Sequence, residues 1–154
     1  MKILIVFATN SGNTFMVGHL IQNALEQKGH QVNMRNASYV TTEEIHDHQV
    51  LLLGSSSWDW QGDEGRPLRS MIELMENLKS EDLDHKPVAI FGCGDTDFTH
   101  FCGAVDHIEE FAKQKNTQIL TDPLKVDKFY LDIKAKTPEI ESWVDSLATK
   151  LKSL

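Results

Sequence analysis

Three short, unbroken apolar runs constrain the fold of this chain more than any other feature. They cover residues 3–7, 50–53 and 88–91. Runs of this length are typical of strands that are covered on both faces, as in parallel sheets packed between two layers of helices. The sequence therefore predicts parallel strands joined by helical crossovers.

Helical segments, marked by apolar residues that recur every three to four positions, separate these runs. Their apolar stripes fall within residues 16–25, 68–78, 101–112 and 140–151. Alternation at residues 32–35 predicts an edge strand, and residues 119–120 predict a short last strand, with residues 124–126 as its continuation. We expect Thr137 and Pro138 to cap the last helix.

The alternation of strands with helices predicts one α/β domain over residues 1–154, built on a doubly wound, five-stranded parallel sheet. Ligands of such sheets bind beyond the carboxyl ends of the strands. Unusual loops follow three of these ends, at residues 8–14, 54–65 and 92–103. We therefore expect these three loops to form the functional site.

The charge and the cysteine content narrow the class of protein. With 15 basic and 23 acidic side chains, the chain has a formal net charge of −8 at pH 7, which repels nucleic acid and anionic lipid. No apolar stretch approaches the roughly 18 residues of a membrane span. The two cysteines, Cys93 and Cys102, fit neither a disulfide framework nor a four-ligand metal site. We expect a cytoplasmic protein with reduced thiols, without a metal, and with basic protein partners.

The first loop has the composition of a phosphate site. It ends an apolar strand, opens a helix, and consists of Thr9, Asn10, Ser11, Gly12, Asn13 and Thr14. Such a turn presents backbone N–H groups and the positive end of a helix to an anion. It lacks the lysine and the glycine spacing of a P-loop, so a triphosphate with magnesium is disfavoured. The loop predicts a site for a single phosphate monoester.

The other two loops carry aromatic side chains that belong to no buried stripe. Trp58 and Trp60 lie in the second loop, and Phe98 lies among the glycines of the third. Glycines allow a backbone to approach a ligand closely. One indole, Trp60 above all, could instead cover the edge of the sheet. A planar aromatic ligand between Trp58 and Phe98, with its phosphate in the first loop, accounts for all three loops.

In these loops the chain resembles the flavodoxins. The similar segments are residues 9–14, Ser56-Ser57-Trp58, residues 91–95 and residues 101–106. The resemblance runs along the whole chain and implies a flavodoxin-like fold with strand order 2-1-3-4-5. Residues 117–126 leave no room for the insertion of the long-chain members, so the chain resembles the short-chain type.

The resemblance implies non-covalently bound FMN, with its ribityl phosphate in residues 9–14 and its isoalloxazine between Trp58 and Phe98. It implies that Asp95 accepts a hydrogen bond from the flavin N3–H and that the backbone around Cys102 meets the polar edge of the ring. The cofactor-binding residues expected in the second and third loops are Ser56, Ser57, Trp58, Asp59, Cys93, Gly94, Asp95, Phe98, His100, Phe101 and Cys102.

The function implied is that of a low-potential one-electron carrier, with no catalytic residues of its own. The donor would be a reductase of the flavodoxin or ferredoxin type, and the acceptors would be redox proteins that dock on the acidic surface of a monomer. Two other flavin functions stay open: a two-electron enzyme acting on quinones, and an activator dedicated to one client protein.

The chain departs from the family pattern at three positions. Phe98 keeps an aromatic ring but lacks the hydroxyl that is common there, and His100 could make the potentials vary with pH. Asp59 follows Trp58 where many relatives have glycine. In the family, the carbonyl of this residue turns toward the flavin when N5 is protonated, which glycine allows at low cost and aspartate at moderate cost.

Other classes of this architecture lack their required residues. A receiver domain needs acidic residues after the first strand and a phosphorylatable aspartate after the third, where this chain has Ala8-Thr9 and Gly54-Ser55. A Rossmann dehydrogenase needs a third glycine where Asp97 stands. A small phosphatase of this architecture needs an arginine six residues after its cysteine, and neither cysteine has one.

Overall fold

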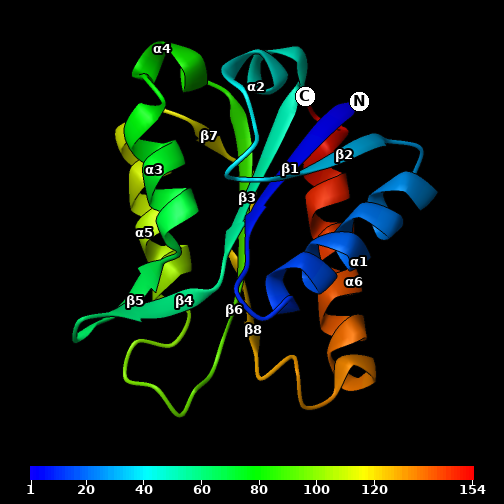
Figure 1. The fold of residues 1–154 in the computed structure, drawn as a ribbon. Helices are drawn as coiled ribbons and strands as arrows, with labels where there is room; N and C mark the ends of the chain where they lie inside the picture. Colours follow the sequence, from blue (N-terminus) through cyan, green and yellow to red (C-terminus); the bar gives the residue numbers. More distant parts are fainter.

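A parallel sheet forms the middle layer of the protein, in a computed structural model that describes residues 1–154 (Figure 1). The strands lie in the order β2-β1-β3-β6-β7, with β8 also paired to β6. Their bounds are β1 (Lys2–Ala8), β2 (Gln31–Asn36), β3 (Val50–Ser55), β6 (Pro87–Gly94), β7 (Gln118–Ile119) and β8 (Leu124–Asp127). All of these pairs are parallel, which confirms the predicted fold class and strand order.

Helices cover both faces of the sheet (Figure 1). Helices α1 (Asn13–Gln27) and α6 (Ile133–Leu151) lie on one face, and α3 (Arg69–Asn77) and α5 (Gly103–Gln114) lie on the other. The short helices α2 (Thr42–Asp47) and α4 (Ser80–Leu83) lie near the amino ends of the strands. No helix combines the length and the apolar character that crossing a bilayer requires.

The apolar runs divide between two buried cores because successive side chains of a strand point to opposite faces. In β1, Ile3 and Ile5 belong to the core beneath α1 and α6. Leu4 and Val6 belong to the core beneath α3 and α5. All four are completely buried, which explains why the run has no polar residue.

The last strand is divided, as its interrupted sequence indicates. β7 pairs with Pro87 and Val88 at the start of β6, whereas β8 pairs with residues 91–94 at its end. Pro123 stands between the two and has no N–H to donate to a ladder. The division carries β8 to the carboxyl end of the sheet, beside the loop that follows β6.

The predicted start of the last helix is wrong. α6 begins at Ile133, and Asp132 caps it by accepting a hydrogen bond from the Ala135 N–H at 3.0 Å. Pro138 lies inside the helix, and the Thr137 hydroxyl donates to the Ile133 carbonyl at 2.9 Å instead of capping. Pro138 is the sixth residue of α6, so its ring removes an N–H that would otherwise donate to the Lys134 carbonyl.

The second loop is more regular than its sequence suggested. It forms an antiparallel hairpin of β4 (Ser57–Trp60) and β5 (Asp63–Pro67), with a register shift between Trp58 and Asp59. Gln61 and Gly62 make the turn with φ angles of 50° and 89°, as a two-residue hairpin turn with the twist of its strands requires. The Asp59 carboxylate accepts a hydrogen bond from the Gly62 N–H at 2.7 Å.

Candidate cofactor-binding site

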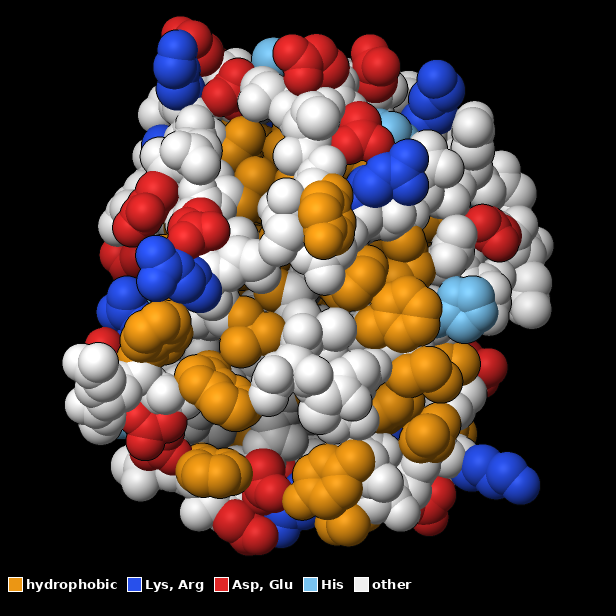
Figure 2. All heavy atoms as spheres, viewed as in Figure 1, with side chains coloured by type: hydrophobic (Ala, Val, Ile, Leu, Met, Phe, Trp, Pro, Cys, Tyr) orange, Lys and Arg blue, Asp and Glu red, His pale blue; other side chains and the backbone are white.

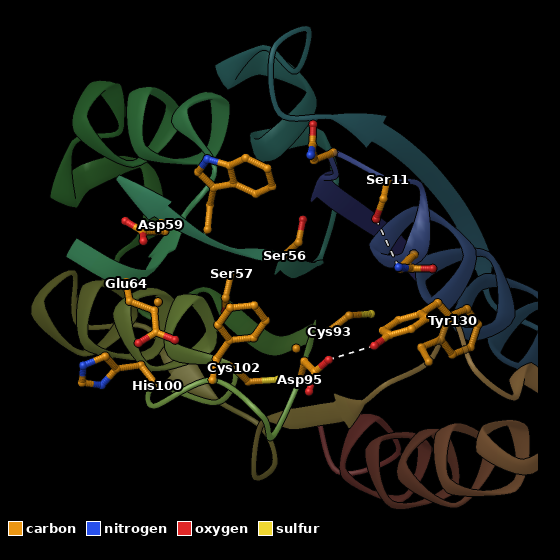
Figure 3. A pocket seen from close by; sticks show the side chains of 17 residues that line it. Ser11, Ser56, Ser57, Asp59, Glu64, Cys93, Asp95, His100, Cys102 and Tyr130 are labelled. Carbon is orange, nitrogen blue, oxygen red and sulfur yellow. Dashed lines mark hydrogen bonds between the residues drawn. The ribbon is translucent and has the colours of Figure 1, made fainter. Parts of the chain in front are cut away.

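A cavity of about 490 Å³ lies at the carboxyl ends of β1, β3 and β6, where the three predicted loops meet (Figure 3). Its size is in the range of about 300–1,000 Å³ that is usual for ligand and cofactor sites. The predicted residues that line it are Asn10, Ser11, Asn13, Ser56, Ser57, Trp58, Asp59, Cys93, Gly94, Asp95, Phe98, His100 and Cys102. The structure therefore brings together residues from all three loops.

The first loop is shaped by its own hydrogen bonds. Gly12 adopts a left-handed φ of 89° directly before α1, and the Thr9 hydroxyl accepts from the Gly12 N–H at 3.0 Å. The Asn13 side chain donates to the Ser11 hydroxyl at 3.1 Å (Figure 3). No side chain caps α1. The N–H groups of its first turn are thus left to a ligand or to water.

Two buried hydroxyls at this end of the site have no hydrogen-bond partner. They are Thr14 Oγ1, on a completely buried residue, and Ser56 Oγ, on a residue that lines the cavity. The Cys93 thiol lies beside Thr14, but a thiol is a weak partner at most. Leaving a buried hydroxyl unpaired costs about 1–3 kcal/mol. Acceptor oxygens of a bound phosphate would remove this cost, so the residues present fit a phosphate group.

Four predicted site residues do not line the cavity. Thr9 and Gly12 shape the turn through the hydrogen bond between them, and Thr14 is completely buried in the first turn of α1. Phe101 packs against the core beneath α3 and α5. The sequence contained a signal for this core position, because Phe101 continues the helical spacing of the apolar residues at 104–112. Its place in the third loop instead suggested contact with the cofactor.

The opposite end of the cavity is open and aromatic. Trp58 and Phe98 both line it and remain 46% and 61% exposed. Large aromatic side chains gain most by covering their faces, so a planar ligand is the natural partner for two exposed rings. Trp60 is 39% exposed and does not line the cavity.

The hairpin and the third loop are joined by specific contacts. The Thr99 N–H donates to Glu64 Oε1 at 3.0 Å, and the Ala104 N–H donates to the Ser57 hydroxyl at 3.1 Å. A Cβ atom at Gly65 would lie 2.7 Å from Cβ of His100. These contacts hold His100 and the hairpin together at the rim.

Both thiols are buried at the floor of the site. Burial raises the pKa of Cys93 and of Cys102 to about 12. Cys102 adopts a left-handed φ of 52°, and its N atom would lie 2.8 Å from a Cβ added to Gly94. Cys102 and Gly94 therefore determine how closely their two backbone segments approach. Because both thiols are protonated, they are poor nucleophiles.

Asp95 is held as a charged group at the polar edge of the cavity. Its carboxylate accepts from the Asp97 N–H at 2.8 Å and from the Tyr130 hydroxyl at 2.8 Å (Figure 3). Lys128 Nζ lies 3.6 Å from it. The Asp97 N–H, followed by Tyr130 and Lys128, lowers the pKa of Asp95.

The structure adds Glu64, Gly65, Phe129 and Tyr130 to the lining. Phe129 and Tyr130 follow the carboxyl end of β8. Ligands of such sheets bind beyond the carboxyl ends of the strands, so this rule could have found both residues once β8 was placed beside β6.

Comparison with known proteins agrees with this geometry. The family described as Flavodoxin matches residues 5–141. A flavodoxin of Maridesulfovibrio salexigens is 35% identical over 152 residues, covering 97% of this chain and 99% of the relative. A flavodoxin of Nitratidesulfovibrio vulgaris is 33% identical with the same coverage. The crystal structure of oxidised Flavodoxin 2 from Bacillus cereus superposes with a TM-score of 0.83 at 29% identity, covering 97% of this chain and 99% of that one.

Proposed function

This chain belongs to the flavodoxin family of FMN-dependent electron carriers, and we propose that it transfers single electrons at low potential between a reductase and acceptor proteins. The observation that carries this proposal is the composition of the cavity. It joins a neutral, hydroxyl-rich turn with two unpaired buried hydroxyls to two exposed aromatic rings.

We assign the phosphate of FMN to the first loop and to the hydroxyls of Thr14 and Ser56. Trp58 and Phe98 would cover the ring system, and Asp95 would accept from its N3–H. The bound cofactor supplies the redox chemistry, and the protein supplies binding, orientation and electrostatics. The thiols in the cavity are protonated, as the raised pKa values of Cys93 and Cys102 indicate, so nucleophilic catalysis by them has no support.

The charges around the ring end support a low potential. Asp59, Glu64 and Asp95 line the cavity, and Asp63 and Asp97 stand close by on the hairpin and the third loop. Fixed negative charges oppose the arrival of an electron, the more so where water is excluded. Lys128 offsets part of this field, because it lies 2.8 Å from Asp97.

The same surface supports docking of basic redox proteins. Apolar and acidic side chains lie interleaved at the end of the molecule that holds the hairpin (Figure 2). Exposed aromatic residues bring the cofactor edge close to a partner, and the carboxylates steer a basic partner toward it. We expect the transfer rate to a reductase to fall as salt is added, and a rate that is independent of salt would contradict acidic docking. Two free thiols support a cytoplasmic location, where thiols stay reduced.

The experiment that tests the function is an anaerobic reductive titration of the protein loaded with FMN, followed by visible absorption. A carrier of single electrons shows two separate one-electron steps, the second at low potential. Reduction in a single two-electron step would contradict the proposal and favour a flavin enzyme. Failure to retain FMN would contradict the assignment of the three loops.

A further inference from the structure

The segment after β8 is tied to the loop after β6 by backbone and side-chain hydrogen bonds. The Lys128 N–H donates to the Gly94 carbonyl at 2.9 Å, which extends the pairing of β6 with β8 by one residue. The Thr96 N–H and hydroxyl both donate to the Asp127 carboxylate at 3.0 Å. The ring end of the site is therefore braced from behind by a strand that is distant in sequence.

Two further bonds reach the carboxylates of the same loop. The Tyr130 hydroxyl donates to Asp95 Oδ2 at 2.8 Å, and Lys128 Nζ donates to Asp97 Oδ1 at 2.8 Å. Each residue from Gly94 to Asp97 thus has a bond to the segment Asp127–Tyr130. Only Asp95 both receives one of these bonds through its side chain and lines the cavity.

The position of Tyr130 is determined by its neighbours in sequence. Phe129 is 1% exposed and belongs to the core beneath α1 and α6. Lys128 adopts a left-handed φ of 47°, which directs the chain into this turn. Tyr130 itself is 54% exposed although it lines the cavity, so core burial does not account for its place.

We propose that Tyr130 is a positioning residue that acts on the FMN ring through Asp95, fixing the orientation of the carboxylate and withdrawing part of its charge from the ring. The proposal deepens the proposed function and rests on it, because it requires the ring to lie beside Asp95.

The physical argument concerns how the charge of one carboxylate is shared. An ionised carboxylate has about four acceptor positions. Each hydrogen bond that it accepts from the protein weakens the hydrogen bond that it can accept from another donor. Tyr130 occupies Oδ2, the Asp97 N–H occupies Oδ1, and positions on both oxygens remain for the ring. The arrangement lowers the pKa of Asp95 and raises that of Tyr130, as expected for a phenol that donates to a carboxylate.

Removal of the Tyr130 hydroxyl should therefore shift the potential of the bound FMN in one direction. In Tyr130→Phe the aromatic ring remains, but Asp95 regains charge density and rotational freedom. Oxidised FMN is affected less than reduced FMN, because only the reduced ring carries additional negative charge. A neutral to charged hydrogen bond of this exposure predicts about a threefold loss of affinity for fully reduced relative to one-electron-reduced FMN. The potential of the second one-electron step should therefore be about 30 mV more negative, at about 59 mV per tenfold for one electron.

The chain offers a matched control, because it has two tyrosines and the other, Tyr39, is 79% exposed after β2, the edge strand on the opposite side of the sheet from β8. The potentials of Tyr130→Phe and Tyr39→Phe would be measured on the FMN-loaded proteins, with FMN release on dilution followed by fluorescence. We expect the potential to shift in Tyr130→Phe and not in Tyr39→Phe. In the Asp95→Asn background the effect of Tyr130→Phe should disappear, since the two residues act as a unit.

Equal potentials for the two phenylalanine variants would overturn the proposal, and so would a shift that persists in Asp95→Asn. Ultraviolet titration of Tyr39→Phe adds a readout that does not need FMN, because Tyr130 is then the sole tyrosine. Its pKa should be above the usual value and should fall in Asp95→Asn. If the wild type fails to retain FMN, the proposed function fails. A normal pKa of the Tyr130 phenol in Tyr39→Phe would separately exclude the contact between Tyr130 and Asp95.

Discussion

The two ends of the cofactor site are built on opposite principles. At the phosphate end, neutral hydroxyls and N–H groups are buried around a turn that has no charged side chain, and Thr14 and Ser56 keep unpaired hydroxyls there. At the ring end, aromatic side chains are exposed and carboxylates surround them. The first arrangement suits the phosphate, whose charge stays the same during electron transfer. The second suits the ring, whose charge changes.

This difference separates affinity from potential. The phosphate has the same charge before and after electron transfer, so contacts at that end stabilise both redox states equally. Only contacts with unequal affinity for two states can shift the balance between them. The ring end therefore sets the potential and meets the partner, while the phosphate end retains the cofactor.

The largest expected effect is at the phosphate end, in Thr14→Val. The change keeps the shape of a completely buried side chain and removes its unpaired hydroxyl. A lost hydrogen bond to a charged group costs about 1.5–3 kcal/mol, so FMN should bind about 10- to 100-fold more weakly. The potentials should stay as in the wild type, and the FMN-free protein should be no less stable to heat.

The control for Thr14→Val is Thr149→Val, on the exposed side of α6. It should alter neither FMN release nor the potentials. A shifted potential in Thr14→Val would show that the two ends are not separable in this way. An unchanged affinity would remove Thr14 from the phosphate site.

At the ring end, the two tryptophans of the hairpin form a matched pair. Trp58 and Trp60 have similar exposure, 46% and 39%, but only Trp58 lines the cavity. Stacking of a base on an aromatic side chain contributes about 1–3 kcal/mol, so Trp58→Ala should weaken FMN binding about 5- to 100-fold and also shift the potentials. Trp60→Ala should do neither. Equal effects in both variants would mean that the hairpin acts through its fold and not through one stacked ring.

Asp59 tests a smaller effect at the same end. Its carboxylate holds the hairpin turn through the Gly62 N–H at 2.7 Å, which opposes rotation of the adjacent peptide. Asp59→Gly removes this bond and permits the rotation that the family couples to reduction. An ordinary hydrogen bond contributes about 1 kcal/mol. The ratio of the equilibrium constants of the two one-electron steps should therefore increase about fivefold, which moves the two potentials apart.

Asp59→Asn distinguishes conformation from charge in that experiment, because an amide oxygen can still accept from Gly62. It should leave the separation near that of the wild type. If Asp59→Asn and Asp59→Gly behave alike, charge and not conformation is responsible. Spectroelectrochemistry of the FMN-loaded proteins measures the separation directly.

The two ends also differ in how far the sequence predicted them. The phosphate turn is local, since one strand end, one glycine and one helix start make it. The sequence predicted it over residues 9–14, of which Asn10, Ser11 and Asn13 line the cavity. The ring end depends on residues brought together from a distance. Tyr130 reaches Asp95 because β8 pairs with the end of β6, and the sequence placed the last strand without showing that β7 and β8 pair with different parts of β6.

Ambiguous residues were resolved by packing. Phe101 fitted both the third loop and the stripe of α5, and the core beneath α3 and α5 decided its place. The hairpin was missed because Asp59, Gly62 and Asp63 suggested an irregular loop, whereas Gln61 and Gly62 form its turn. Pro138 suggested a helix start, but Asp132 supplies the cap five residues before Thr137.

The smallest functional effect is expected for the thiols that lie between the two ends. Burial raises the pKa of Cys93 and of Cys102 from 9.0 to about 12, so the thiolate fraction below pH 9 is about a thousandfold lower than in the unfolded chain. Alkylation by iodoacetamide at pH 8, followed by mass spectrometry, should be slow in the folded protein and rapid in urea. Cys93→Ser and Cys102→Ser should leave the potentials of the FMN-loaded protein nearly unchanged.

The same pKa values determine how stability varies with pH. Between pH 9 and 12 the unfolded thiols lose their protons while the folded ones keep them, so the folded state binds more protons and its stability falls as the pH rises. Below pH 9 this contribution is fully present. Urea unfolding of the wild type and of the double serine variant compares the two slopes, and the variant should lose less stability over this interval. Equal slopes, or rapid alkylation of the folded protein, would show that the thiols are ionised or accessible and that the floor joining the two ends is open.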